Sequence, residues 1–392
     1  MNKKIATMSI AALIILASCA PSYDNKEDVV EDNTSEQDSG ETAIIPSHSV
    51  SEQEYQVLLP YKMSQSRGVI TNQIANRLDI DAIEQGLRRH STEVYDPDDY
   101  YFQEGQKLTS DVVYKWLERY AKEDSGKDNP LGLNPALPNV DEKDKEELIE
   151  AERNNPKYVS HILEQNYLMK TSENAVQLGG VSIAIAMKSN YRFQTEVGGP
   201  YYYEDISKKK MLSEANRVAK EVVNRMRQMD GLDDVPIMVA IYREEGRDSL
   251  VPGNFVAKTN VKGGSSTIKD WKAINEEYVL YPSSELTDID PDTNANLEDF
   301  EIDVSEYFPN YVGVIGEGFY VDDQLKKLTL EIPIRFKGKA EVVGFTQYVY
   351  GLIVDGFEDH FDLEVNITSS DKQESLIYRK AGEKEPNVHI YD

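Results

Sequence analysis

The chain of 392 residues contains one cysteine and far fewer basic than acidic side chains. It has 42 Lys+Arg against 70 Asp+Glu, which gives a formal net charge of −28. A single cysteine cannot close an intramolecular disulfide or build a cysteine-rich zinc site, so packed cores must stabilise the fold. The excess of carboxylates is opposite to the charge that binds a nucleic-acid backbone, and it would repel an anionic lipid surface. We therefore expect no nucleic acid among the partners.

Motifs of the common enzyme classes are also missing. None of the five histidines stands in a His-Glu-x-x-His zinc motif, and there is no Gly-x-Ser-x-Gly nucleophile elbow. Residues 288–299 place carboxylate and amide oxygens at alternate positions, as a calcium loop does. However, Thr293 stands where such a loop needs glycine and Asp299 where it needs glutamate, which favours an acidic solvated loop. The sequence predicts no enzyme, no metal site and no cofactor.

Tyrosines form two short clusters, Tyr100-Tyr101 and Tyr201-Tyr202-Tyr203. Aromatic rings can stack on sugars, so these clusters are candidates for carbohydrate binding. We favour packing as their role, since 24 tyrosines in one chain readily produce such neighbours.

The amino terminus has the features of a secretory signal. Lys3 and Lys4 precede an apolar stretch over 5–16, which is shorter than the ~20 residues of a membrane-spanning helix. The stretch ends in Leu16-Ala17-Ser18-Cys19, the pattern of a bacterial lipobox. In a lipobox the cysteine thiol receives a diacylglycerol, and a peptidase then cleaves the bond before that cysteine. The alternative is an ordinary signal peptide with an accidental cysteine near its cleavage site.

We expect residues 1–18 to be the signal peptide and Cys19 to be the lipid attachment site, because the only cysteine stands where a lipobox requires one. Each buried methylene of an acyl chain contributes ~0.8 kcal/mol of membrane affinity, so two chains anchor the protein without a basic patch. The expected partners are the membrane, through this lipid anchor, and the lipoprotein-processing peptidases. The expected location is the extracytoplasmic face of the cell membrane.

The domain organisation predicted next is a tether followed by a mainly helical region. Residues 19–50 are acidic and poor in aromatic residues, so we expect a disordered, extended tether. Residues 51–155 are predicted to be mainly helical, with one helix over 68–90 and another over 109–123 that begins at Thr109 or Ser110. A charged helix is expected over 141–155.

The rest of the chain contains an internal duplication. Residues 156–168 align without a gap on 309–321, and 181–188 align on 328–335. Residues 235–241 align on 361–367, with a gapless extension that pairs Ser249 with Ser375. Each copy combines two alternating strands, a helix and a third strand. The predicted fold class is therefore α+β, with a mainly helical N-terminal region and two copies of a strand-strand-helix-strand unit over 156–257 and 309–392, joined by an acidic connector over 258–308.

The stretches at 58–62, 67–68, 96–106 and 132–135, together with the duplicated half, carry a likeness to a known family. They resemble the CamS family of sex-pheromone precursor lipoproteins of Gram-positive bacteria. The resemblance implies that a short apolar peptide is trimmed from the cleaved signal sequence and released as a plasmid-mating pheromone. The matching positions are Ala12-Leu13-Ile14-Ile15-Leu16-Ala17-Ser18. The family pattern is Ala-Ile-Phe-Ile-Leu-Ala-Ser, so Leu13 and Ile14 depart from it.

The sequence thus predicts a lipid-anchored precursor whose released peptide acts on a receptor in another cell, through an apolar groove of that receptor. The mature part is expected to be a non-enzymatic binding or interaction module. The alternative is a cell-wall-related enzyme or carbohydrate-binding lipoprotein with a site between the two copies.

Overall fold

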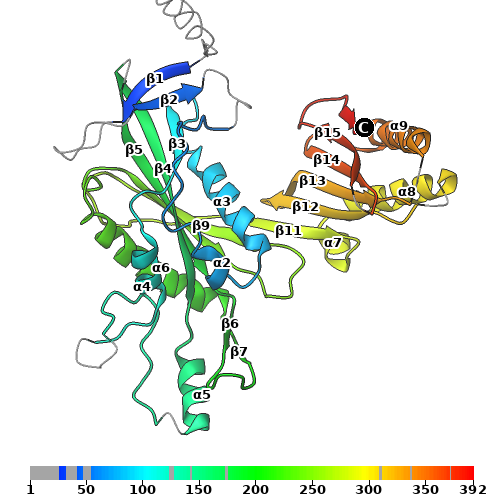
Figure 1. Ribbon diagram of the computed structural model, residues 1–392. Coiled ribbons are helices and arrows are strands. Elements are labelled where there is room, and N and C mark those ends of the chain that lie inside the picture. Colours follow the sequence, from blue (N-terminus) through cyan, green and yellow to red (C-terminus); the bar gives the residue numbers. More distant parts are fainter. Residues whose placement is uncertain are drawn as a thin grey trace, which may run out of the picture. The chain divides into compact units, whose positions relative to one another are not determined.

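The computed structural model describes residues 26–31, 42–46, 54–122, 128–141, 144–172, 175–308, 311–335, 338–370 and 372–392 (Figure 1). Cys19, the lipobox and the heptapeptide at 12–18 lie outside these residues. The chain divides into two compact units. Within the described residues, the first unit includes those up to 62 together with 95–103 and 167–179, and the second includes 63–94, 104–166 and the residues from 180 onward.

The first unit contains a hairpin of β1 (Lys26–Glu31) and β2 (Thr42–Pro46), which pair antiparallel. β1 also pairs in parallel with the first residues of β5 (Ala175–Met187), where Val30 faces Ala175. The unstructured tether expected over 19–50 is therefore partly replaced by strands. The physical reason is that Val29 and Ile45 are buried in one cluster with Leu58 and Leu168, which stabilises the hairpin despite its acidic neighbours.

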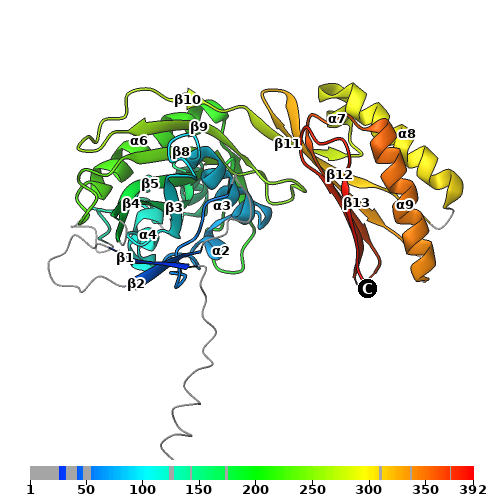
Figure 2. The ribbon, with the colours of Figure 1, turned by 90° about the horizontal axis from the view of Figure 1, so that it is seen from above.

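The larger sheet of the second unit follows the order β10-β9-β8-β5, and β4 also pairs with β5. The bounds are Val159–Ser172 for β4, Ile237–Arg243 for β8, Asn254–Val261 for β9 and Lys272–Ala273 for β10. β3 (Tyr100–Glu104) pairs with β4. α3 (Leu78–Ser91) and α6 (Lys208–Met226) both pack on β8 (Figure 2). Between β5 and α6 lies the hairpin of β6 (Asn190–Phe193) and β7 (Tyr202–Asp205).

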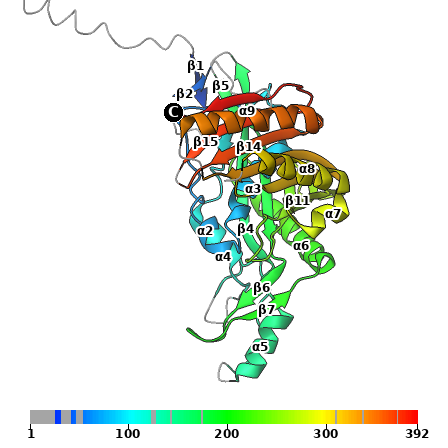
Figure 3. The ribbon, with the colours of Figure 1, turned by 90° about the vertical axis from the view of Figure 1, so that its right-hand side faces the viewer.

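The second sheet has the strand order β11-β12-β13-β14-β15-β16. Its strands are Glu276–Tyr281, Ile315–Val321, Gln324–Pro333, Asp362–Thr368, Gln373–Arg379 and Asn387–Ile390. α8 (Pro291–Tyr307) and α9 (Lys339–Gly356) lie side by side on this sheet (Figure 3). Their buried side chains share one core with the strands. The predicted α+β class is confirmed.

Several local expectations differ from the structure. The helix expected over 68–90 is divided into α2 (Ile70–Gln73) and α3, because Ile74 adopts an extended conformation. The expected helices over 109–123 and 141–155 are shorter, namely α4 (Ser110–Leu117) and α5 (Lys145–Asn154). The side chain of Thr109 caps α4 by accepting a hydrogen bond from the Val112 amide.

The acidic stretch 258–308 is not merely a connector, because it supplies β11, α7 (Ser284–Ile289) and α8 to the second sheet and its helical layer. The solvated loop expected over 288–299 is mostly helix. The Asp290 side chain accepts a hydrogen bond from the Thr293 amide, and Pro291 occupies the first turn of α8. Both features favour a helix start over a calcium loop.

The gapless extension of the duplication also fails locally. Ser249 lies in a turn, whereas Ser375 lies in β15. In the first sheet Ile241 pairs with Ala257, and in the second sheet its aligned counterpart Ile367 pairs with Ser375. The structural counterpart of Ser375 is therefore Ala257 and not Ser249.

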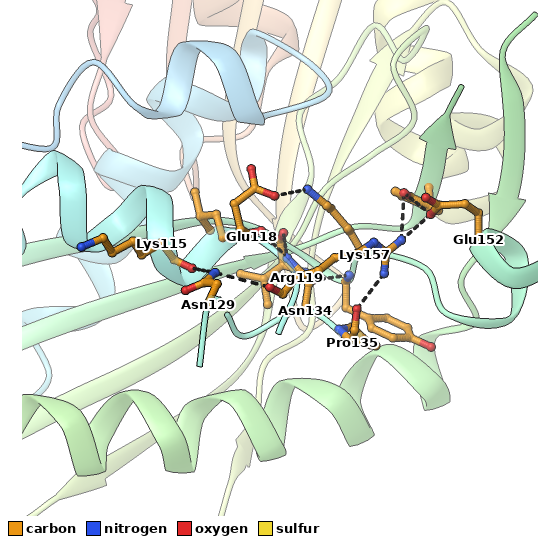
Figure 4. A network of polar contacts seen from close by, with 12 residues as sticks. Lys115, Glu118, Arg119, Asn129, Asn134, Pro135, Glu152 and Lys157 are labelled. Atoms are coloured by element: carbon orange, nitrogen blue, oxygen red, sulfur yellow. Dashed lines mark hydrogen bonds and ion pairs between the residues drawn. The ribbon is translucent and has the colours of Figure 1, made fainter. Parts of the chain in front are cut away.

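A polar network joins α4, the loop after it, α5 and β6 (Figure 4). Buried Asn134 donates hydrogen bonds to the carbonyls of Leu117 (2.7 Å) and Val159 (3.2 Å) and accepts them from the amides of Tyr158 (2.7 Å) and Val159 (2.9 Å). Arg119 donates to the Pro135 carbonyl and pairs with Glu152. The Tyr191 hydroxyl donates to the same Glu152 at 2.7 Å, so this network holds the start of β6.

We predict that Asn134→Ala lowers the free energy of unfolding by roughly 2–4 kcal/mol, because it leaves buried backbone groups without partners. Urea unfolding followed by circular dichroism measures the change. Asn296→Ala, an exposed position on α8, is the matched control and should change stability by less than about 0.5 kcal/mol. Equal effects of the two substitutions would contradict the structural role assigned to Asn134.

Candidate functional site

The second unit contains a cleft of about 820 Å³ at the carboxyl ends of the parallel strands β5 and β8. Its lining residues come from the end of α2 and the residues after it (72–75), from the segment after β5 (188–190 and 192), from the segment before α6 (201, 203 and 205–207), and from the end of β8 and the loop after it (243 and 245–249). Ligands of sheets with parallel strands typically bind outside the carboxyl ends of those strands. The position of this cleft therefore makes it the candidate site.

Basic side chains are prominent in the cleft, although the whole chain is strongly acidic. Those that line it are Lys188, Arg192, Arg243 and Arg247. The carboxylates of Asp205, Glu245 and Asp248 also line it. Two of these carboxylates have partners within the cleft: Arg243 pairs with Glu245 at 3.2 Å, and Asn190 donates to Asp205 at 2.6 Å.

Arg192 is the most distinctive of the basic residues. Its guanidinium carbon lies 3.2 Å from the centroid of the Tyr201 ring, so the two groups stack. Its Nε is buried without a hydrogen-bond partner, and no carboxylate pairs with its guanidinium within the described part of the chain. Stacking fixes the plane of the guanidinium and leaves its N–H edges available to an acceptor.

Behind the cleft lies a buried carboxylate, Glu244, which is only 1% exposed. Its Oε2 is 3.8 Å from Nζ of Lys188, and neither oxygen accepts a hydrogen bond from a described residue. Lys188 also donates to the Gln73 carbonyl at 3.3 Å. These contacts hold the lysine at the end of β5.

The end of β8 is held by a second buried carboxylate, Asp79 of α3. Its Oδ1 accepts hydrogen bonds from the Tyr242 hydroxyl (2.7 Å) and from the Gly253 amide (2.7 Å). Burial nevertheless raises the pKa of Asp79 to about 7, and the nearby charge of Glu244 acts in the same direction.

The tyrosines considered from the sequence have different positions. Tyr201 and Tyr203 line the cleft and are about half exposed. Tyr202 stacks on Phe193, with ring centroids 5.5 Å apart. Tyr100 and Tyr101 belong to the first unit.

No metal centre is found where the structure describes the chain, since no three His, Cys, Asp or Glu side chains there could hold an ion together. His161 is buried, which lowers its pKa to about 3 and keeps the ring neutral. Across the same residues, no helix combines the length and the apolar character that crossing a membrane requires.

Sequence reasoning missed the four basic residues of the cleft. A signal for two of them was available, because Lys188 directly follows β5 and Arg243 ends β8, and parallel strands bring their carboxyl ends to one edge. Arg192 and Arg247 lie in a hairpin and a loop whose positions the strand pattern does not determine.

The family model described as "CamS sex pheromone cAM373 precursor" matches residues 61–385. The chain belongs to the CamS family. Among solved structures it is similar to a sex pheromone precursor from Lactobacillus salivarius, with 30% identity, a TM-score of 0.79 and coverage of 88% of this chain and 98% of the other. It is also similar to the C-terminal domain of the sex pheromone staph-cAM373 precursor from Staphylococcus aureus, with 29% identity, a TM-score of 0.69 and coverage of 82% and 99%. No curated protein matches the chain.

Two of the motifs that suggested CamS membership, at 104–106 and 132–135, have structural roles in the second unit. The carboxylate of buried Glu164 accepts hydrogen bonds from the amides of Gln106 (3.1 Å), Lys107 (3.0 Å) and Leu108 (2.7 Å). A Cβ on Gly105 would lie 2.5 Å from the Glu164 side chain, so this position requires glycine. A Cβ on Gly132 would lie 2.3 Å from the backbone of Arg119.

We predict that Asp79→Asn changes how stability depends on pH. The folded pKa of about 7 exceeds the usual value of 3.8, so the folded wild type binds more protons than the unfolded chain. Its stability is therefore fully present below the lower pKa and falls as pH rises through the higher one. As pH rises from about 4 to 8, the free energy of unfolding of the variant should therefore increase by roughly 2–4 kcal/mol relative to that of the wild type.

Urea unfolding at several pH values tests this difference. Asp81→Asn, an exposed position on the same helix, is the control and should show little change with pH relative to wild type. A constant difference between Asp79→Asn and wild type across the pH range would refute the raised pKa.

Proposed function

We propose that the chain is a lipid-anchored extracytoplasmic precursor whose signal peptide supplies a pheromone-like peptide and whose folded part is a non-enzymatic binding module. The observation that carries the anchoring proposal is the position of the only cysteine, Cys19, at the end of a lipobox. Membership of the sex-pheromone precursor family supports the role of the signal peptide.

Peptide release requires two cuts. A lipoprotein peptidase cleaves the bond between Ser18 and Cys19 after the thiol is acylated, which leaves an apolar fragment in the membrane. A second cut between Ala11 and Ala12 then frees Ala12-Leu13-Ile14-Ile15-Leu16-Ala17-Ser18, since small residues suit such a cut. The released peptide is small enough to leave the bilayer and to reach a receptor in another cell.

The cleft at the ends of β5 and β8 supports a binding role for the folded part. It contains paired charges, exposed tyrosine rings and amide groups, and these are groups that recognise ligands. The alternative is a cell-wall-related enzyme or carbohydrate-binding lipoprotein with a site between the two repeats. Turnover of cell-wall fragments by the purified chain would favour that alternative, whereas binding without turnover would favour the module.

We also propose that the two sheets derive from a duplication. The series β4-β5-α6-β8-β9 and β12-β13-α9-β14-β15 have the same order of strands and helix. β5 pairs in parallel with β8 as β13 does with β14. The registers that place Val181 opposite Ile237 and Leu328 opposite Leu363 join positions that the sequence alignment makes equivalent. The hairpin β6–β7 occurs in the first series, and it lines the cleft.

We predict that Cys19→Ala abolishes lipid attachment, because it removes the thiol that forms the thioether. The variant should move from the detergent phase to the aqueous phase, or remain as an uncleaved precursor of higher mass. Phase partitioning and mass spectrometry of whole cells measure both outcomes. Ser22→Ala, outside the lipobox, is the control and should behave as wild type. Unchanged partitioning and processing of Cys19→Ala would rule out the anchor.

We predict that the heptapeptide ending at Ser18 accumulates in culture medium and acts on recipient cells. Its apolar side chains enter a receptor groove largely by burial, at ~25 cal/mol per Å² of apolar surface. Because Ile14 lacks the aromatic ring of the family's phenylalanine, recipients tuned to the Phe form should respond more weakly to the heptapeptide than to its Ile14→Phe analogue. Titration of both synthetic peptides in a plasmid-transfer assay measures the difference. Absence of the heptapeptide from producing cultures, or no response to either peptide, would leave only the anchored module.

A further inference from the structure

We propose that the cleft at the ends of β5 and β8 binds a phosphate group that is attached to a sugar or polyol. The proposal rests on the binding role proposed above for the folded part and names the chemistry of the ligand. It follows from the charges, the unpaired donors and the aromatic rings of the cleft.

The charge pattern of the cleft is the first argument. Carboxylates greatly outnumber basic side chains in the chain, with 70 Asp+Glu against 42 Lys+Arg, so an unpaired guanidinium does not reflect a shortage of partners. Arg192 and Arg247 nevertheless form no ion pair with any described residue. Two such cations in one cleft offer charge-assisted hydrogen bonds to an anion.

The orientation of Arg192 is the second argument. Its guanidinium is held flat on the Tyr201 ring, with 3.2 Å between the guanidinium carbon and the ring centroid. Arg192 follows Tyr191, which the polar network around Glu152 holds in place. The buried Nε of Arg192 has no acceptor among the described residues, so that side of the guanidinium is not satisfied by the protein and its terminal N–H groups are the ones that face a ligand. A planar donor fork held in this way matches two oxygens of a phosphate.

The beginning of α6 adds to the positive potential of the cleft. Ser207 lines the cleft and caps α6, which has 19 residues and begins with three lysines, Lys208 to Lys210. The first turn of this helix contains no acidic residue. Helix N-termini favour negative charge, so an anion next to Ser207 would be stabilised there. Lys210 pairs with Glu214 at 3.2 Å, whereas no partner for Lys208 or Lys209 is found among the described residues.

The other lining groups indicate what carries the phosphate. Tyr201 and Tyr203 are 48% and 54% exposed and can pack against a sugar ring. The cleft is also lined by three carboxylates, those of Asp205, Glu245 and Asp248. Their negative charge disfavours a ligand that is negatively charged along its whole length. They can instead accept hydrogen bonds from hydroxyl groups. A phosphate with a neutral, hydroxyl-rich neighbour satisfies both parts of the cleft.

Isothermal titration of the chain from Cys19 onward with glucose 1-phosphate, glycerol 1-phosphate and glucose tests the inference. We expect the two phosphate compounds to bind at least tenfold more tightly than glucose. Arg192→Gln should weaken glucose 1-phosphate binding about tenfold, the effect of losing one charge-assisted interaction. The control is Arg335→Gln, which makes the same change of charge at an exposed position after β13, outside the cleft. This variant should bind as the wild type does.

A second arm distinguishes the source of the phosphate. Vesicles of phosphatidylcholine with and without phosphatidylglycerol are mixed with the same variants. Arg192-dependent binding to the phosphatidylglycerol vesicles assigns the phosphate to a lipid headgroup, and Arg192-dependent binding to the soluble compounds alone assigns it to a soluble sugar or polyol phosphate. Either result supports phosphate recognition by the cleft.

The inference is overturned if the phosphate compounds bind no better than glucose, or if Arg192→Gln binds them as wild type does. Binding of glucose that is lost in Tyr201→Ala, but not in Tyr201→Phe or Arg192→Gln, would overturn the phosphate inference and leave the binding module intact. No binding of any soluble compound or vesicle would overturn it as well, and the anchoring proposal would still be decided separately by the partitioning of Cys19→Ala.

Discussion

The parallel pairing of β5 with β8 determines where the candidate site can form. Their register runs from Val181 opposite Ile237 to Met187 opposite Arg243, and almost every side chain in it is buried. Parallel strands cannot be joined by a tight turn, so the chain must leave the sheet and cross over before it returns. Here the crossover contains both the hairpin β6–β7 and α6. The same pairing therefore brings Lys188 and Arg243 to one edge of the sheet, where both line the cleft together with residues of the crossover.

Supports behind the strands make this edge rigid. Asp79 fixes Tyr242 next to Arg243, and the network of Arg119, Glu152 and Tyr191 fixes the residue before Arg192. Each support is a buried or half-buried polar group whose hydrogen bonds run to a different element of the second unit. Loss of one support should displace a cleft residue without unfolding the sheet, because the strand ladder itself remains paired.

The residues that revealed the family are not the residues that line the cleft. Gly105, Gly132 and Asn134 are required by close backbone approach or by buried hydrogen bonds. Such requirements produce recognisable motifs in a sequence, because few residue types can meet them. The cleft instead depends on charged side chains in loops, where many sequences are compatible with the same backbone. Family membership could therefore be predicted from the sequence, while in the candidate site only Lys188 and Arg243 had a signal, through their places at the ends of β5 and β8.

Among the strands and helices, those with a local sequence signal were predictable, and those stabilised by residues distant in sequence were not. β5, β8, β13 and β14 were predictable because buried strands carry apolar runs or alternation. The start of α8 was also accessible, since Asp290-Pro291 is a recognisable cap, although the acidic composition of 288–299 favours a solvated loop. The hairpin β1–β2 was not predictable, because its stability depends on Leu58, Leu168 and Val176, which are distant in sequence. The break at Ile74 likewise has no signal in the apolar periodicity.

The net charge of −28 affects how the proposed phosphate ligand would reach the cleft. At a distance the ligand meets the field of the whole chain, which is repulsive, whereas inside the cleft it meets the nearby cations. Salt screens the distant repulsion more strongly than the short contacts, since exposed charges more than about 8 Å apart are largely screened at physiological ionic strength. Moderate salt should therefore accelerate association while it weakens the bound state only slightly. This behaviour is opposite to that of a basic protein on a polyanion, for which added salt lowers affinity steeply.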